Sequence, residues 1–166
     1  AYVAYNYIEK VWYYGTLARQ AWLDRGIRTL PLATGGQYLY NHEVGFDDDG
    51  SAMTSFIESA PMDIGDGDKF VSLKRVIPDI TFNGSTATNP SVAFTMKARN
   101  NPGADFNQTT QGTTTRESPS TVEQFTQKLD YRLRGRSFVL RVDSTALGTK
   151  YKLGTPRVDI REDGRR

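Results

Sequence analysis

The sequence predicts an all-β protein built from antiparallel sheets. Short runs of alternating apolar and polar residues recur along the chain, and clusters of Gly, Pro, Asn and Asp separate them. Few segments show helical periodicity together with capping residues. A spacing of roughly 8–12 residues between such runs is typical of β-sandwiches and propellers. We therefore expect part of a β-propeller-like or β-sandwich platform.

The expected strands of the first half lie between turn residues. Residues 7–14 and 17–23 are expected to form a hairpin that turns near Gly15. Three further strands are expected after Gly- and Asp-rich turns, at residues 37–44, 53–58 and 70–77. Together these segments predict a series of short antiparallel strands.

The clearest expected strand spans residues 92–99, whose apolar and polar side chains alternate. The apolar residues that share one face are Val92, Phe94, Met96 and Ala98. Residues 100–103 (Asn-Asn-Pro-Gly) end the strand with turn chemistry. Residues 104–121 are rich in Thr, Gln, Gly and Ser and nearly lack aliphatic side chains, so we expect a flexible loop or arm there.

The last part of the chain is expected to form arginine-rich strands. Tyr131 and Leu133 are apolar at odd positions, whereas Phe138 and Leu140 are apolar at even ones. A β-bulge at Gly135-Arg136 would correct this change of phase. We therefore divide the chain into an antiparallel β region (residues 1–103, with an acidic first half), a loop or arm (104–121) and C-terminal strands of the same domain (122–166).

Composition and charge set limits on the class of protein. The 166 residues suit one domain or a large piece of a longer chain, and the start lacks a methionine, so we expect sequence upstream. Cysteine is absent, which excludes disulfides, and no apolar run is long enough to span a membrane. Residues 1–68 hold 4 basic and 10 acidic side chains, whereas residues 69–166 hold 17 and 9. Such asymmetry favours head-to-tail contacts between subunits or a face turned towards a polyanion.

Two acidic segments are candidate cation sites, but ordinary turn chemistry explains both. Residues 47–58 space oxygen-bearing side chains as a calcium loop does, yet Ala52 stands where the sharp turn demands glycine. Residues 63–68 carry three carboxylates among glycines, as β-turns often do. We expect neither a metal nor a cofactor.

No catalytic motif is evident in the sequence. His42 is the only histidine, no nucleophile elbow accompanies it, and no glycine-rich phosphate loop is present. Glu43, Glu58 and Asp79 stay open as members of a glycosidase carboxylate pair, because the separation of such a pair is spatial rather than sequential. We expect no enzymatic activity and no catalytic residues.

Two groups of side chains are candidate contact surfaces. Aromatic residues in strands are commonly core or cross-strand partners, but they also stack on sugars or bases. These aromatic residues are Trp12, Tyr13, Tyr14, Trp22, Tyr38 and Tyr40. Guanidinium groups bind carboxylates or phosphates at two points, so the arginines of the last strands are expected to contact another subunit or DNA. We assign this contact to Arg132, Arg134, Arg136, Arg141, Arg157 and Arg161, and Arg165 and Arg166 follow them.

Several stretches resemble tail proteins of short-tailed bacteriophages, of the DNA-stabilisation, hub or nozzle type. These stretches are residues 11–15 with Arg19, Ala21-Trp22 and Asp24, residues 39–43 with Gly45 and residues 47–50, residues 57–59 and 75–79, and the ending from residues 132–136 through 153–161. The likeness covers most of the chain except the segment around 104–121, and it contains no diagnostic catalytic motif. At roughly 40–50 residues per blade, the chain is too short for a complete propeller, which favours a C-terminal part of such a protein.

The resemblance implies a structural protein of the virion tail. Such a protein forms a homo-oligomeric ring, expected to be a hexamer, that extends the DNA channel and assembles by charge-complementary contacts. Its expected partners are other tail proteins on the portal or adaptor side, the fibres, and packaged double-stranded DNA in the lumen. The alternative is a carbohydrate-binding β-sandwich for host recognition, with the Trp and Tyr side chains as its platform.

Overall fold

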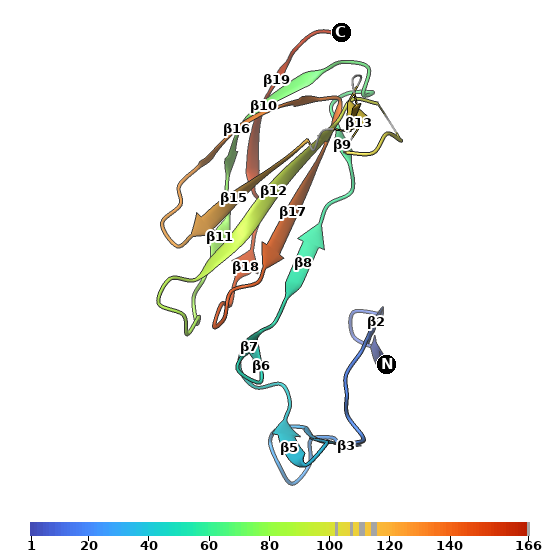
Figure 1. The fold of residues 1–166 in the computed structure, drawn as a ribbon, viewed down its shortest axis with the longest axis vertical. Helices are drawn as coiled ribbons and strands as arrows, with labels where there is room; N and C mark the ends of the chain where they lie inside the picture. Colours follow the sequence, from blue (N-terminus) through green and yellow to red (C-terminus); the bar gives the residue numbers. More distant parts are fainter. Residues whose placement is uncertain (102, 107, 110–111, 114–115, 166) are drawn as a thin grey trace. The chain divides into compact units, whose positions relative to one another are not determined.

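The computed structural model describes residues 1–101, 103–106, 108–109, 112–113 and 116–165. Every regular element in these residues is a β-strand and every strand pair is antiparallel, which confirms the all-β class (Figure 1). No sheet formed by these residues is closed, so the propeller-like and sandwich alternatives stay predictions. The described residues include no helix that could cross a membrane. The chain divides into two compact units, Ala1–Gly45 (unit 1) and Phe46–Arg166 (unit 2).

Unit 1 consists of a hairpin and a small sheet. The hairpin pairs β1 (Tyr2–Asn6) with β2 (Val11–Gly15), and the sheet has the order β3 (Ala21–Leu23), β4 (Leu32–Gly35), β5 (Tyr38–Asn41). Pro31, Leu32, Ala33 and Gly35 are buried, and the remaining strand residues of the unit are half-buried or exposed. Unit 1 therefore has very little core of its own.

The predicted hairpin of residues 7–14 and 17–23 is wrong, because the turn comes earlier in the chain. The Asn6 side-chain oxygen accepts hydrogen bonds from the backbone N–H groups of Ile8 (3.0 Å) and Glu9 (3.1 Å). This Asx-type turn reverses the chain over residues 7–10, with Lys10 at a positive φ of 57°. Residues 11–15 then pair with β1, and β3 pairs with β4 instead.

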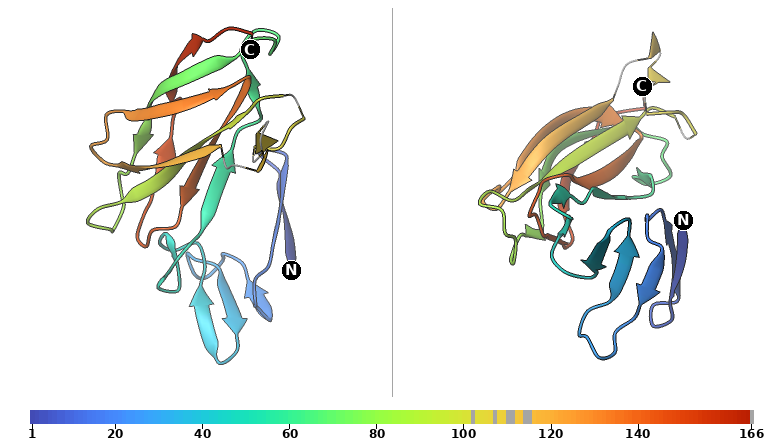
Figure 2. Two further views of the ribbon diagram at one scale, coloured as in Figure 1. Left: turned by 45° about the horizontal axis from the view of Figure 1, so that its top comes forward. Right: turned by 60° about the horizontal axis from the view of Figure 1, so that its bottom comes forward.

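Unit 2 is organised around two larger sheets (Figure 2). The first, which we call the β12 sheet, has the order β15 (Glu117–Glu123), β12 (Ser91–Arg99), β17 (Ser137–Ser144), β8 (Ser55–Glu58), and β9 (Met62–Asp63) also pairs with β17. The second, the β10 sheet, has the order β16 (Leu129–Gly135), β10 (Val71–Ile77), β19 (Arg157–Glu162).

Three small strand pairs complete unit 2. They are β6 (Asp47–Asp48) with β7 (Ser51–Ala52), β11 (Ile80–Thr81) with β18 (Lys152–Leu153), and β13 (Gln108–Thr109) with β14 (Gly112–Thr113). The expected loop of residues 104–121 lies partly outside the described residues. Its last residues, 117–121, belong to β15, and the flexibility of the remainder stays a prediction.

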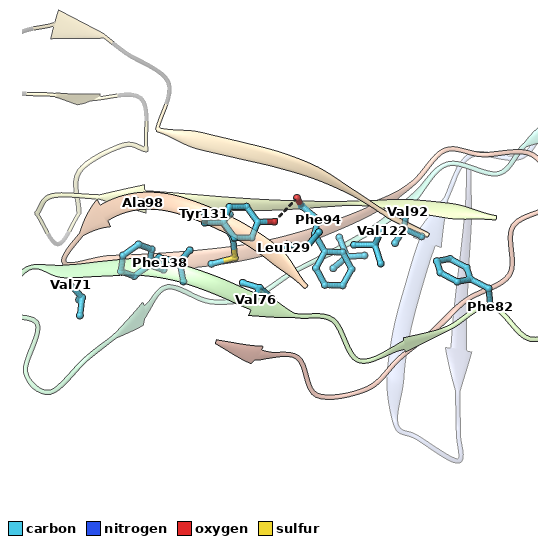
Figure 3. Packing of buried hydrophobic residues seen from close by; sticks show 13 residues of the cluster. Val71, Val76, Phe82, Val92, Phe94, Ala98, Val122, Leu129, Tyr131 and Phe138 are labelled. Atoms are coloured by element: carbon cyan, nitrogen blue, oxygen red, sulfur yellow. Dashed lines mark hydrogen bonds between the residues drawn. The ribbon is translucent and has the colours of Figure 1, made fainter. Parts of the chain in front are cut away.

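The inner faces of the two sheets supply one hydrophobic core (Figure 3). As the sequence predicts, Val92, Phe94, Met96 and Ala98 of β12 are all buried, and the residues between them are not. The β10 sheet contributes buried side chains to the same cluster: Val71, Leu73, Val76, Leu129 and Tyr131. Because strand side chains alternate, the polar residues of both sheets are left on the outer faces.

The predicted β-bulge at Gly135-Arg136 is wrong. Strand β16 ends at Gly135 in the β10 sheet, and β17 begins at Ser137 in the β12 sheet. The apolar phase changes here because the chain crosses from one sheet to the facing one, so the core lies on its other side. A Cβ at Gly135 would lie 2.9 Å from the carbonyl oxygen of Arg99, so the crossing needs glycine. The irregular register occurs instead between Leu73 and Arg75 of β10.

Candidate polyanion-binding surface

The outer face of the β10 sheet carries most of the predicted arginines. The register places Arg134 of β16 and Arg161 of β19 on either side of Ser72 in β10. The alternation of each strand then places Arg132, Arg157 and Arg161 on the face away from the core. The basic side chains of this face are Lys74, Arg75, Arg132, Arg134, Arg157 and Arg161, against Asp130, Asp159 and Asp163. The face is therefore clearly cationic.

Some of these cations have partners on the same face and others do not. Arg134 Nε lies 2.6 Å from Asp163 Oδ2, and Arg75 Nε lies 3.7 Å from Asp130 Oδ1. Three other arginines of this face form no ion pair and no side-chain hydrogen bond with any described residue: Arg132, Arg157 and Arg161. A shallow depression of about 820 Å³ lies over this face, and Lys74, Arg75, Arg132 and Arg134 are among the residues that line it.

Arg141 lies elsewhere, on the outer face of the β12 sheet, and is held within unit 2. Its guanidinium donates to Asp143 (2.7 Å) and to Glu58 (3.2 Å) and stacks 4.0 Å from the centre of the Phe56 ring. The hydrogen bonds to Asp143 and then Glu58 raise the pKa of Arg141. Its charge is matched inside the unit, and the external contact of Arg141 stays a prediction.

Acidic side chains among residues 46–68 also form contacts within unit 2. Glu58 accepts a hydrogen bond from Lys97 Nζ at 3.0 Å, which is the main cause of its lowered pKa. Asp68 lies 3.6 Å from Arg165, and Asp47 accepts a hydrogen bond from the backbone N–H of Gly148. The charge difference between the two parts of the sequence is therefore partly matched within one chain.

Arg136 lies in the turn between β16 and β17, next to three other arginines. Its backbone N–H donates to the Arg99 carbonyl at 2.9 Å, and its guanidinium lies over the Phe70 ring with that of Arg134. Arg116 donates to the side-chain oxygen of Asn100 and to the carbonyl of Arg134. We call Arg99, Arg116, Arg134 and Arg136 the arginine cluster.

The cluster is crowded with positive charge. Burial lowers the pKa of the Arg116 guanidinium, and the nearby charge of Arg134 lowers it further. The Nε atoms of Arg99 and Arg136 are buried and have no hydrogen-bond partner among the described residues. Both features indicate cationic groups that the described part of the chain does not compensate.

The sequence analysis missed four members of this cationic region: Lys74, Arg75, Arg99 and Arg116. The alternation within residues 92–99 already placed Arg99 on the polar face, and the same argument applies to Lys74 in residues 70–77. Arg116 precedes β15 and belongs to no alternating run, so no periodicity could assign it. Its position depends on a long-range contact with β16.

Several of the carboxylates considered for metal binding or catalysis have partners within their own unit. Asp79 accepts a hydrogen bond from the backbone N–H of Thr155 at 2.8 Å, and Glu43 of unit 1 pairs with Arg25. The described residues contain no group of three His, Cys, Asp or Glu side chains arranged to hold a metal ion.

The predicted aromatic residues lie on strands β2, β3 and β5 of unit 1, and all of them except the half-buried Tyr40 are exposed. The Trp22 ring lies 4.8 Å from the His42 ring, and Arg19 Nε donates to His42 Nε2 at 3.1 Å. Tyr2, Arg19, Trp22, His42 and Glu43 are among the residues that line a pocket of about 690 Å³ within this unit. Aromatic and polar side chains of unit 1 thus line one pocket.

Comparison with known proteins gives no family for the chain. No family model matches it, and a search of curated proteins finds no match either. The resemblance to tail hub and nozzle proteins therefore stays a prediction.

Proposed function

We propose that the chain is a structural component of a larger assembly, without catalytic activity, of the phage-tail hub or nozzle type that its sequence resembles. One observation carries this proposal, which is the exposure of the apolar side chains of unit 1. Leu32 and Ala33 are the only buried hydrophobic side chains there apart from Pro31, whereas sixteen large hydrophobic side chains of the unit are exposed. A unit of this kind gains little stability from its own core and needs a partner surface.

The exposed aromatic area alone has the size of a stable interface. Eight aromatic side chains of unit 1 are between 45% and 88% exposed: Tyr2, Tyr5, Tyr7, Trp12, Tyr13, Tyr14, Trp22 and Tyr38. With about 200 Å² for each full aromatic side chain, they leave on the order of 1,000 Å² in water. Each partner in a standard protein interface buries about 800 Å².

The partner that suits this surface best is a second copy of the chain. Strands β1, β2, β3 and β5 each have one unpaired edge within unit 1, and unpaired edges pair readily with strands of another chain. Every copy offers the same edges, so a head-to-tail contact repeats from copy to copy and closes into a ring where the rotation permits. We base this contact on apolar strands, because Glu58 and Asp68 already pair with cations of their own unit.

The test is the assembly state of the chain, measured by sedimentation velocity and negative-stain electron microscopy. We expect rings at micromolar concentration, and Tyr14→Ser is expected to weaken them, because Tyr14 is 88% exposed and makes no ring contact with a described residue. The matched control is Phe125→Ser, which removes an aromatic side chain of unit 2 that is 86% exposed. A chain that stays monomeric at high concentration contradicts the proposal, as does equal weakening by both variants.

The pocket of unit 1 favours one alternative, a carbohydrate-binding protein for host recognition. Trp22 offers an apolar face for a sugar ring, and Arg19, His42 and Glu43 supply hydrogen-bonding groups around it. A glycan array tests this alternative. Reproducible binding of a saccharide that is lost in Trp22→Ala supports it, and an array without binding removes it.

A further inference from the structure

We propose that the arginine cluster of unit 2 binds phosphate groups of a nucleic-acid backbone. The cluster consists of Arg99 at the end of β12, Arg116 before β15, Arg134 in β16 and Arg136 in the turn to β17. This inference is independent of the proposed assembly, since it rests on unit 2 and uses none of the exposed strands of unit 1.

The fold brings the four arginines together through main-chain contacts. The Arg136 N–H donates to the carbonyl of Arg99, and the N–H of Ala98 donates to the carbonyl of Arg116 at 3.0 Å. Arg116 in turn donates to the carbonyl of Arg134. Three separate strand ends therefore meet at one point, and each brings a guanidinium group to it.

The positive charge at this point exceeds what the described residues match. Asp163 forms an ion pair with Arg134. Arg116 and Arg136 donate only to neutral oxygens among the described residues, which are the Asn100 side chain and the carbonyls of Arg134 and Arg165. The Nε atoms of Arg99 and Arg136 are buried and have no hydrogen-bond partner among the described residues, so an acceptor from outside would reach these two arginines through their terminal NH2 groups.

Aromatic rings lie against three of the four guanidinium groups. The Arg134 and Arg136 groups lie 4.1 and 4.8 Å from the centre of the Phe70 ring, and Arg99 lies 5.7 Å from that of Phe106. Stacking uses the flat face of a guanidinium, so its N–H groups can still donate hydrogen bonds, as those of Arg134 do to Asp163 and that of Arg136 does to the Arg165 carbonyl. Guanidinium N–H groups also match the oxygens of a phosphate group.

The surroundings of the cluster favour a polymer of phosphates over a single anion. Arg134 belongs both to the cluster and to the outer face of the β10 sheet, where Arg132, Arg157 and Arg161 have no described ion-pair partner. A strand of seven residues such as β10 extends about 20 Å, at roughly 3.3 Å per residue. Duplex DNA carries a charge about every 1.7 Å of its axis, so several phosphates lie within reach of such a face.

The experiment measures binding of the whole chain to a fluorescently labelled 20-base-pair DNA duplex by anisotropy, over a range of salt concentrations. We expect affinity that falls steeply with salt, because each neutralised phosphate adds about 0.9 to the slope of log K against log salt. Arg99→Gln and Arg136→Gln are each expected to weaken binding about tenfold at low salt and to reduce that slope by about 0.9. The matched control, Lys152→Gln in β18 at the other end of the unit (Figure 1), removes the same charge and is expected to leave the affinity within about twofold.

Thermal unfolding separates binding from folding. Removal of one uncompensated cation relieves repulsion within the cluster, so Arg136→Gln is expected to unfold at the same or a higher temperature than the parent chain.

The inference is overturned if the duplex does not bind at about 50 mM salt, or if the cluster variants and Lys152→Gln have the same DNA affinity. It is also overturned if poly-glutamate competes better than unlabelled DNA, because the cluster then recognises an acidic protein. Tyr14→Ser is expected to leave DNA affinity per chain unchanged, so failure of ring assembly and failure of DNA binding are distinguishable.

Discussion

The hydroxyl of Tyr131 donates a hydrogen bond to the carbonyl oxygen of Phe94 across 3.3 Å, inside the shared core of unit 2 (Figure 3). Tyr131 is 3% exposed and belongs to β16, whereas Phe94 is fully buried in β12. This bond therefore joins the β10 sheet to the β12 sheet through a polar contact within an otherwise apolar interior.

Tyr131→Phe tests this contact at neutral pH. The variant keeps the ring and its packing but removes the donor, so we expect a loss of about 1 kcal/mol in the free energy of unfolding. Urea denaturation followed by circular dichroism measures the difference. A variant as stable as the parent would show that the bond contributes nothing.

The same hydroxyl predicts a loss of stability at alkaline pH. Burial raises the pKa of Tyr131, so the folded chain keeps the phenol neutral at pH values where the unfolded chain already ionises it. The stabilisation is complete below about pH 10, the ordinary tyrosine value, and is lost as the pH rises towards the folded pKa. The difference in unfolding free energy between pH 8 and pH 11 should be smaller in Tyr131→Phe than in the parent. Equal differences contradict the prediction.

For Glu58 we predict that the stability of the fold falls as the pH is lowered. The pKa of Glu58 is lowered, chiefly by the hydrogen bond from Lys97 and also by Arg141. A carboxyl of this kind stabilises the fold above its ordinary pKa of about 4.3, and the stabilisation is lost as the pH falls through the lower folded pKa. Glu58→Gln should cost less than about 1 kcal/mol at pH 7, since the pair is partly exposed, and should flatten the melting temperature between about pH 5 and 3.

Alanine substitutions at Gly148 and Gly50 compare the loss of stability caused by a Cβ that meets other atoms with the loss caused by one that does not. Both glycines have positive φ, 65° and 83°, so alanine at either is expected to cost about 1–2 kcal/mol. A Cβ at Gly148 would lie 2.6 Å from Thr86 Oγ1 and 2.9 Å from the Ala87 nitrogen, whereas one at Gly50 meets nothing within 4 Å. Gly148→Ala should therefore lose a further 1–3 kcal/mol, approximately. Chemical denaturation of the two variants gives the comparison, and equal losses would contradict it.

Truncation of Leu73 tests how much the buried core of unit 2 contributes to the free energy of unfolding. Leu73 is fully buried at the centre of β10, and truncation of such a leucine to alanine costs about 2–5 kcal/mol. Leu147→Ala, at a leucine that is 53% exposed, is the control and should change stability by less than about 0.5 kcal/mol. Similar effects of the two substitutions would show that the β10 sheet does not pack as described.

The strands that the sequence located best are those with one buried face. Residues 92–99 alternate because β12 lies against the facing sheet, so the pattern predicted both the strand and its buried residues. Residues 70–77 were located by the Gly- and Asp-rich turn before them, and β10 spans Val71–Ile77. The first hairpin was misplaced because its apolar residues are exposed, which leaves no alternation to fix the register, and because a single side chain, Asn6, sets the turn.

The cationic surface could be predicted in outline but not in its grouping. Alternation placed Arg132 and Arg134 together on one strand face, and the structure places Arg161 beside them through β10. It could not show that Arg141 lies on the other sheet with Glu58 and Asp143, because that depends on the crossing at Gly135. Arg116 reaches Arg134 only through the fold.

The pairing order of unit 2 has a consequence for biosynthesis. Strand β12 needs β17 as its neighbour, and β10 needs β19, so both sheets depend on strands that are translated after them. While the ribosome is still making residues 137–162, β10 and β12 have apolar faces and no complete set of neighbours. A chaperone that binds nascent chains would act during that interval. Premature termination before Arg157 would release a chain with exposed apolar strand faces, which is prone to aggregate.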